Sequence, residues 1–232
     1  MGKTAILVDG GFFLKRMYTL LGDVTAEERA SQLIRYSTRH LTEHNVHHDL
    51  YRIFYYDCPP LDTQLFHPLL GKAINLKGSK QYKWMVEFIK CLYSKRKVAV
   101  RLGKLGKDAQ YILKYEAVKK LVSKKITVDD LTDNDFQCTV QQKGVDMRIG
   151  IDIASLAFKK QVDQIVLISG DSDFVPAAKL ARREGIDFIL DPLNQDIAPD
   201  LFEHIDGKRT CLSTEEIDNK KLKTKKSGIT FK

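Results

Sequence analysis

The feature that most constrains this chain is an alternation of short apolar segments with longer amphipathic ones. Four apolar segments have the length and the β-branched or aromatic content of strands, namely 4–9, 49–57, 164–169 and 186–191. Amphipathic segments of helical length lie between them. Strands that alternate with helices form parallel pairs through βαβ crossovers. We therefore predict an α/β fold, a three-layer α/β/α sandwich with a mainly parallel central sheet.

Helix signals support this alternation. Thr25 is a candidate N-cap with Glu28 three residues later, and Gly185 is placed to end a helix. Between the main strands we also predict strands over 98–105 and 135–144. The predicted helices are 13–21, 25–44, 79–97, 109–125, 146–161 and 174–185.

Charge is unevenly distributed along the 232 residues. The segment 77–143 contains 16 Lys or Arg and 7 Asp or Glu, a net charge of +9, whereas the whole chain has +8. Such a block indicates either a polyanionic partner or a solvated lysine-rich surface. We predict one domain over 1–206 that includes this segment, followed by a basic and flexible tail over 207–232, where apolar periodicity ends.

The apolar runs are much shorter than the ~20 residues of a membrane helix. The first residues, “MGKTAILVDGG”, indicate a strand rather than a secretory signal. We therefore expect a cytoplasmic protein with no membrane partner.

Acidic residues follow several of the predicted strands. Asp9 ends the first strand, Asp171 and Asp173 follow the strand 164–169, and Asp146 follows the strand predicted to end near Gly144. Because the carboxyl ends of parallel strands meet at one edge of a sheet, we expect these four carboxylates to lie together. Each of them except Asp171 could also serve only as a helix N-cap.

Four clustered carboxylates repel one another unless cations neutralise them. Mg²⁺ and Mn²⁺ prefer oxygen ligands, and the hydroxyls of Ser169 and Ser172 are near enough in sequence to orient the carboxylates. A divalent ion in such a site suits hydrolysis of a phosphodiester, and a basic surface would hold the rest of the nucleic acid backbone.

Three sequence blocks resemble the signatures of the NYN domain. They are “ILVDGG”, “KGVDMRIGIDIA” and “LISGDSDFVPAAKLARREGI”, in that order, and the resemblance extends to about residue 192. The NYN family includes the LabA-like proteins and belongs to the PIN-like nuclease superfamily. The resemblance implies a PIN-like fold and a Mg²⁺- or Mn²⁺-dependent endoribonuclease whose catalytic and metal-binding residues are Asp9, Asp146, Asp171 and Asp173.

The chain departs from the family pattern at two places. Phe12 stands where many members have Asn, and Met147-Arg148 replaces small apolar residues. Asp152 also matches a family position, and because it lies six residues after Asp146 it faces another side of the helix. We expect a supporting role for Asp152, and also for Lys143 of “KGVD”.

Several basic residues are candidates for contacts with nucleic acid. Lysines interleave with aromatic residues in “KQYKWMVEF”, a pattern that suits stacking on unpaired bases and also suits a helix core stripe. The glycine-rich “RLGKLGK” is a candidate loop against a phosphate backbone. The predicted nucleic-acid contacts are Lys80, Lys83, Arg101, Lys104 and Lys107.

The leading hypothesis is a metal-dependent endoribonuclease that acts on RNA, with DNA as a further candidate substrate and a homodimer as a candidate assembly. A second hypothesis is an RNA-binding or regulatory protein with weak or no catalysis, because fold does not fix function. A third is a phosphatase with an aspartyl nucleophile. That chemistry requires two acids after the first strand, and this chain has only Asp9 there.

Overall fold

The computed structural model describes residues 2–43, 46–213 and 215–217. The chain forms two compact units. The first consists of Met1–Asp57, Glu87–Gly103 and Gly144–Lys232, and the second of Cys58–Val86 and Lys104–Lys143. The basic segment 77–143 therefore contributes to both units, and the helix α3 (Lys80–Tyr93) passes from one to the other.

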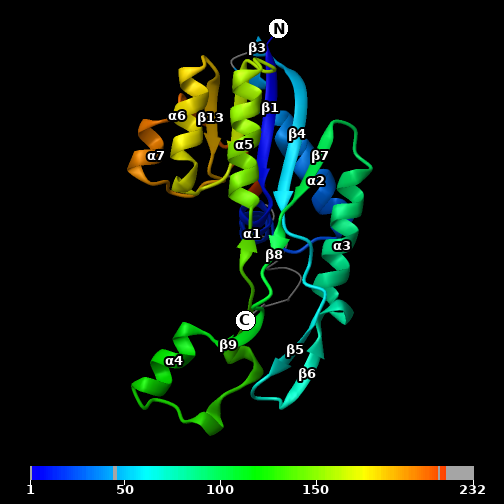
Figure 1. Cartoon of the computed structure of the whole chain (residues 1–232), viewed down its shortest axis with the longest axis vertical. Helices are drawn as coiled ribbons and strands as arrows, with labels where there is room; N and C mark the ends of the chain where they lie inside the picture. The colour runs from blue at the N-terminus through cyan, green and yellow to red at the C-terminus, as the bar shows by residue number, and fades with distance from the viewer. Residues whose placement is uncertain (1, 44–45, 214, 218–232) are drawn as a thin grey trace. The chain divides into compact units, whose positions relative to one another are not determined.

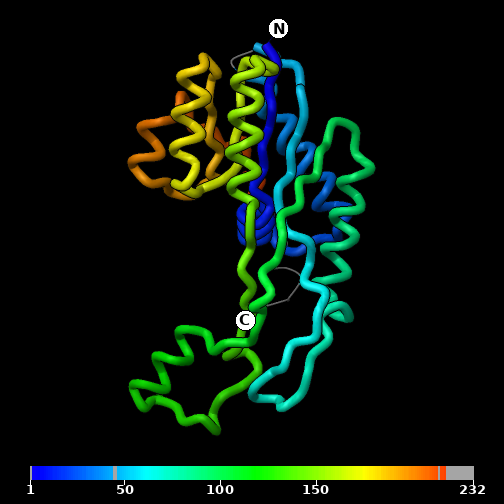
Figure 2. Tube along the Cα trace, viewed as in Figure 1, coloured from blue at the N-terminus to red at the C-terminus, as the bar shows by residue number. Residues whose placement is uncertain are grey.

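A six-stranded sheet forms the centre of the first unit (Figure 1), and every neighbouring pair in it is parallel. Tracing the chain in Figure 2 shows that β1, from the N-terminal end, runs between strands from later parts of the sequence. In spatial order the strands are β14 (Gly207–Lys208), β13 (Asp187–Asp191), β12 (Gln164–Ile168), β1 (Lys3–Asp9), β4 (Asp49–Asp57) and β7 (Val98–Leu102).

Helices lie on both faces of this sheet. Helices α5 (Val145–Phe158) and α6 (Val175–Arg183) cover the face toward the viewer in Figure 1, and α1 (Gly10–Leu21) and α2 (Ala26–Arg39) lie behind the sheet. A short helix, α7 (Pro199–Glu203), follows β13. The predicted three-layer α/β/α sandwich with a parallel sheet is confirmed.

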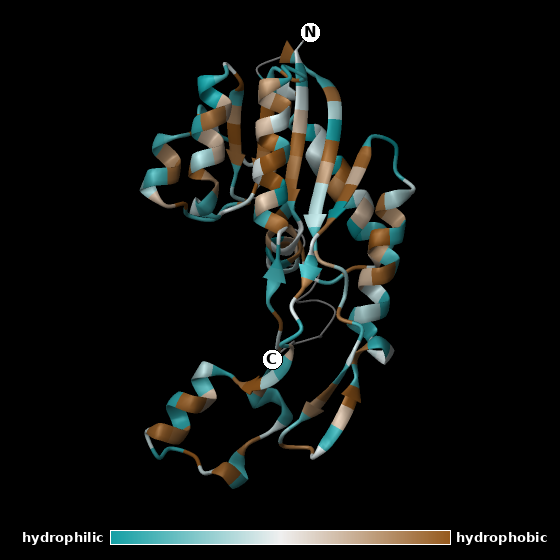
Figure 3. Cartoon of the chain, in the orientation of Figure 1, coloured by the Kyte–Doolittle hydropathy of each residue, from teal (hydrophilic) through white to brown (hydrophobic). Residues whose placement is uncertain are grey.

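The strands form the core of the first unit. Residues 5–8 and 165–168 are fully buried, and most of the sheet appears brown in the hydropathy colouring of Figure 3. The register aligns the ends of the strands, because Val8 pairs with both Ile168 and Tyr55. The residues that follow these strands therefore gather at one edge of the sheet.

The second unit consists of antiparallel pairs with short helical segments. Its paired strands are β5 (Gln64–His67) with β6 (Lys72–Asn75), β9 (Gln110–Leu113) with β10 (Phe136–Thr139), and β8 (Lys104–Leu105) with β11 (Gln142–Lys143). The buried ring of His67 lies 4.5 Å from the ring of Tyr111 and 4.9 Å from that of Phe136, measured between centroids. The short helical segments of the second unit are η1 (Leu76–Gly78), α4 (Tyr115–Val122), η2 (Val128–Asp130) and η3 (Asp133–Asp135).

Two predicted elements of the basic segment are confirmed only in part. The helix predicted over 109–125 begins only at Tyr115, because residues 110–113 pair with 136–139 as strand β9. The strand predicted over 135–144 forms two short strands, β10 and β11, which pair with β9 and β8 in the second unit and do not join the central sheet. Pairing between distant residues thus overrode the local helical pattern of the first segment.

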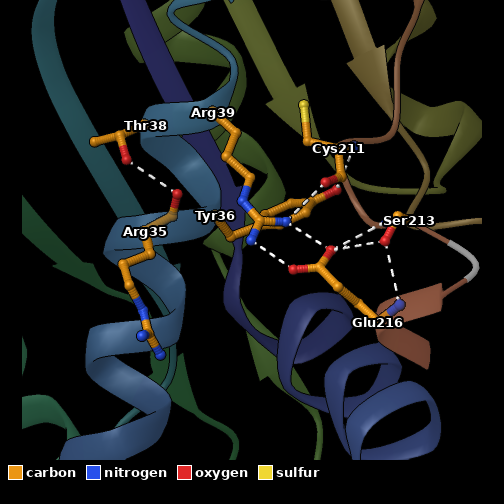
Figure 4. A network of polar contacts seen from close by, with 7 residues as sticks. All are labelled: Arg35, Tyr36, Thr38, Arg39, Cys211, Ser213 and Glu216. Atoms are coloured by element: carbon orange, nitrogen blue, oxygen red, sulfur yellow. Dashed lines mark hydrogen bonds and ion pairs between the residues drawn. The ribbon is translucent and has the colours of Figure 1, made fainter. Parts of the chain in front are cut away.

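Part of the predicted tail packs against the first unit. The carboxylate of Glu216 accepts two hydrogen bonds from Arg39, at 2.6 and 2.8 Å, and the backbone amide of Cys211 donates to the hydroxyl of Tyr36 at 3.2 Å (Figure 4). Leu212 and Ile217 are buried. The rest of the predicted tail, residues 218–232, lies outside the described residues.

The first unit also contains an antiparallel pair of short strands, β2 (Thr42–Glu43) and β3 (Val46–His47).

Candidate active site

Asp9 is the last residue of β1 and also the N-cap of α1, where its Oδ1 accepts a hydrogen bond from the backbone amide of Phe12 at 3.1 Å. The helix follows the strand directly because residue 10 is glycine. A Cβ at Gly10 would lie 2.4 Å from the ring of Tyr55 and 2.6 Å from the carbonyl oxygen of Tyr56. The tight passage from strand to helix therefore fixes the Asp9 carboxylate at the edge of the sheet.

The charge on Asp9 is unfavourable in this position. The pKa of Asp9 is raised from 3.8 to about 6, mainly by burial, and the charges of the nearby acids Asp146 and Asp57 contribute in the same direction. The hydrogen bonds from the Phe12 amide and from the hydroxyl of Ser169, which donates to Oδ2 at 3.2 Å, offset only part of this effect. Among the described residues, no Lys, Arg or His forms an ion pair with Asp9 that would stabilise its ionised form.

Asp171 and Asp173 lie in the turn that follows β12. Asp171 is the N-cap of the short helix η4 (Ser172–Phe174), and its Oδ1 accepts a hydrogen bond from the amide of Asp173 at 3.0 Å. The amide of Asp171 donates to the hydroxyl of Ser169 at 3.3 Å, and that same hydroxyl donates to Asp9. Ser169 is fully buried and so links the two acidic segments, whereas Ser172 lies within η4.

Asp146 reaches the same group of acids from a helix. It lies in the first turn of α5, two residues after Gly144, whose φ of 77° is in the left-handed region that favours glycine. Partial burial raises the pKa of Asp146, and the charges of Asp171 and Asp173 raise it further. Because Asp146 acts electrostatically on Asp9 as well, the four predicted acids form one negatively charged cluster.

Asp57 is an acidic residue near this cluster that the sequence reasoning missed. It ends β4, which pairs with β1, and it is 2% exposed. Its Oδ2 accepts a hydrogen bond from the hydroxyl of Tyr55 at 2.7 Å, and its charge contributes to the raised pKa of Asp9. The rule that placed Asp9 at the carboxyl edge would have found Asp57 too, since “YYDCPP” ends a predicted strand.

Asp152 and Arg101 contact each other away from the acid cluster. The Asp152 carboxylate accepts hydrogen bonds from the hydroxyl of Tyr56 at 2.8 Å and from Nε of Arg101 at 3.2 Å. The Arg101 guanidinium also lies over the ring of Phe54, 5.6 Å from its centroid. These contacts tie α5 to β4 and β7, and the supporting role expected for Asp152 stays a prediction.

The remaining predicted basic residues belong to the second unit. Lys80 and Lys83 lie in the first turns of α3, Lys104 and Lys143 lie in the paired strands β8 and β11, and Lys107 follows β8. All five side chains are exposed. Their predicted contacts with nucleic acid, and the supporting role predicted for Lys143, stay predictions.

Phe12, the departure from the family pattern, packs against the turn that carries Asp171. A Cβ at Gly170 would lie 2.9 Å from the ring of Phe12. The aromatic ring and the glycine therefore fit each other, while the backbone amide of Phe12 still donates to Asp9.

The donor set suits a hard divalent cation, because it offers carboxylate and hydroxyl oxygens, the ligands that such an ion prefers. Within residues 2–43, 46–213 and 215–217, no three His, Cys, Asp or Glu side chains have an arrangement that could hold a metal ion.

Comparison with known proteins decides the family. The NYN domain family matches residues 77–201, which is more than half of the chain and includes Asp146, Asp171 and Asp173. The chain belongs to the NYN domain family. NYN domains are part of the PIN-like superfamily and have a nuclease-like fold. The match begins after the first block, so Asp9 lies outside it, and the LabA-like subtype stays a prediction.

One solved structure similar to this NYN protein is a protein of unknown function from Vibrio parahaemolyticus. It has 15% sequence identity and a TM-score of 0.46, with 91% of this chain and 94% of that chain covered. No curated protein matches the chain. None of the helices within the described ranges combines the length and the apolar content needed to span a bilayer.

Proposed function

We propose that this NYN protein is a Mg²⁺- or Mn²⁺-dependent endoribonuclease whose site consists of Asp9, Asp146, Asp171 and Asp173. The observation that supports it best is the position of these acids at the carboxyl edge of the sheet, where burial above all, and then the charge of Asp146, raise the pKa of Asp9 to about 6, and where burial and the charges of Asp171 and Asp173 raise the pKa of Asp146. A cluster whose negative charges oppose one another is suited to bind a cation. Membership of the NYN family supports nucleic acid as the substrate class.

In this proposal Asp9, Asp146, Asp171 and Asp173 are the residues that would hold the ion, and a Mg²⁺ ion usually retains several of its waters. When bound, a divalent cation activates water and offsets negative charge on the phosphate. The protein supplies the orientation of the carboxylates. Ser169 holds Asp9 through its hydroxyl, and the amide of Asp173 holds Asp171, so both side chains are positioned before substrate arrives.

The deciding experiment compares cleavage of a labelled single-stranded RNA with Mn²⁺ by wild type, Asp171→Asn and Asp163→Asn. Asp163 is a matched control because it lies just before β12, at the opposite end of the strand that leads to Asp171. We expect Asp171→Asn to reduce cleavage at least about 100-fold, on the order of the loss of one electrostatic contact in a catalytic site. Asp163→Asn should cleave like wild type. Equal cleavage by all three proteins would refute the assignment.

The same assay separates the alternative functions. An RNA-binding protein without catalysis would retain labelled RNA in a binding assay but leave it intact with every divalent ion tested. A phosphatase would hydrolyse a small phosphomonoester, and we expect no turnover of that substrate.

We also propose RNA in preference to DNA, a cytoplasmic location and a homodimer. The exposed apolar side chains Met147, Ile151 and Phe158 of α5 support the homodimer.

A further inference from the structure

Helix α4 of the second unit exposes an aromatic and aliphatic side. Tyr115 is 74% exposed, Val118 38% and Val122 77%. Their spacing of three and then four residues places them on one side of the helix, and Ala117 is buried on another side. The helix therefore uses Ala117 to pack and presents Tyr115 to solvent. Figure 3 shows that α4 carries both hydrophobic and hydrophilic residues.

Lysines surround this exposed side. The stretch 114–125, “KYEAVKKLVSKK”, contains five Lys and one Glu. Lys119 follows Tyr115 by one helical turn, and Lys124 and Lys125 follow the end of α4; all three are exposed. In the part of the chain that the structure describes, these three lysines form no ion pair with an acid. Their charges are therefore available to a partner.

The second unit as a whole is basic. It has twelve Lys against seven Asp or Glu, a net charge of +5. Several of its acids are already used within the unit. Asp62 pairs with Lys77, Asp133 contacts His67, and Asp130 and Asp135 cap the turns that start at Thr127 and Thr132. The free lysines beside Tyr115 thus face solvent in a unit of net positive charge.

We propose that the side of α4 formed by Tyr115, Val118, Lys119 and Val122, with Lys124 and Lys125, binds single-stranded RNA. Tyr115 stacks on an unpaired base, the valines contact the same or the next base, and the lysines contact phosphates. The choice of RNA as the polyanion rests on the proposed function. The eight residues of α4 offer one aromatic and two valines, too little apolar surface for an interfacial membrane helix.

The test measures RNA affinity in the full chain with Asp171→Asn in the background, so that binding is observed without cleavage. A fluorescent single-stranded RNA is titrated against this protein, against the same protein with Tyr115→Ala, and against a matched control with Tyr93→Ala. Tyr93 is 63% exposed at the end of α3. We expect Tyr115→Ala to raise Kd at least about fivefold, as for loss of one stacked base, and Tyr93→Ala to leave it unchanged.

The lysines are tested by the salt dependence of the same Kd. Substituting Lys119→Ala and Lys124→Ala together should reduce the slope of log K against log salt by about 1.4, since each phosphate contact on a single strand contributes about 0.7. The exposed Lys159, which follows α5, is the control site, and Lys159→Ala should leave the slope unchanged. Thermal unfolding of every variant shows whether it is folded.

The proposal is overturned if Tyr115→Ala and the lysine pair bind RNA as the controls do. It is also overturned if Tyr115→Ala impairs only binding to phosphatidylserine vesicles, since the surface would then recognise lipid. Failure of the proposed nuclease function would give a different result in these assays. Wild type that binds RNA through this surface but never cleaves it removes the nuclease assignment and supports the inference.

Discussion

The raised pKa of Asp9 makes a specific prediction about stability in the absence of metal. In the folded protein Asp9 keeps its proton up to a pH of about 6, whereas the unfolded chain releases it near 3.8. Between these values the folded protein binds more protons than the unfolded chain, so raising the pH favours unfolding. The contribution of Asp9 to stability therefore falls from pH 3.8 to about 6 and then stays constant.

The size of the effect follows from the same two values. A pKa difference of about 2 corresponds to about 3 kcal/mol of unfolding free energy. Asp9→Asn has no charge to bury, and its side-chain oxygen can still accept the hydrogen bond from the Phe12 amide. We expect Asp9→Asn and wild type to be similarly stable at low pH. The variant should be more stable by about 3 kcal/mol at neutral pH.

The assay is urea unfolding of both proteins in EDTA across this pH range, with Asp163→Asn as control. Taking the difference between variant and wild type cancels the other titrating groups. Adding Mn²⁺ at neutral pH should then stabilise wild type more than Asp9→Asn, because a cation favours the ionised carboxylate. A difference between Asp9→Asn and wild type that is constant across the pH range would refute the reasoning.

Two further predictions concern packing and the C-terminal segment. Gly170→Ala should lower the free energy of unfolding, measured with urea, by about 1–3 kcal/mol. Phe12→Leu in the same chain should recover part of this loss. An equal loss with and without Phe12 would contradict the contact between Phe12 and Gly170. Glu216→Gln should lower the free energy of unfolding by less than about 1 kcal/mol. It should also speed hydrogen exchange at the Cys211 amide. Arg39 lowers the pKa of Glu216 to about 2, so this stabilisation is lost as pH falls from 4.5 toward 2.

The strands and helices of the first unit could be predicted from the sequence because local and distant preferences agree there. Residues 165–168, “IVLI”, are all apolar and form most of β12, which is buried on both faces. Thr25 accepts a hydrogen bond from the Glu28 amide at 3.2 Å, as expected of an N-cap. In both places the residue pattern alone determines one structure, and the tertiary fold does not change it.

The second unit could not be predicted in the same way. Residues 110–113 have a helical pattern with 115–122, yet they form β9 because 136–139 are available as a partner strand. Only the second of these segments lies within a predicted strand, 135–144. Their pairing becomes favourable only when the rings of Tyr111 and Phe136 enclose His67, which lies more than 40 residues before them. Contacts at such separations in sequence are not visible to periodicity.

Position at the carboxyl edge of the sheet is not sufficient to identify a functional acid, and Asp191 shows why. It ends β13 beside β12, but its Oδ2 accepts from Tyr36 and lies 2.9 Å from Nε2 of His40, and its Oδ1 accepts from the Leu193 amide and the Thr210 hydroxyl, each at 2.8 Å. These hydrogen-bond partners occupy the acceptor positions of both carboxylate oxygens, so Asp191 has a structural role. Asp171 is exposed and its Oδ1 holds the Asp173 amide, which leaves oxygen lone pairs directed to solvent. The donors already bound, and not the place in the sheet, separate the two kinds of acid.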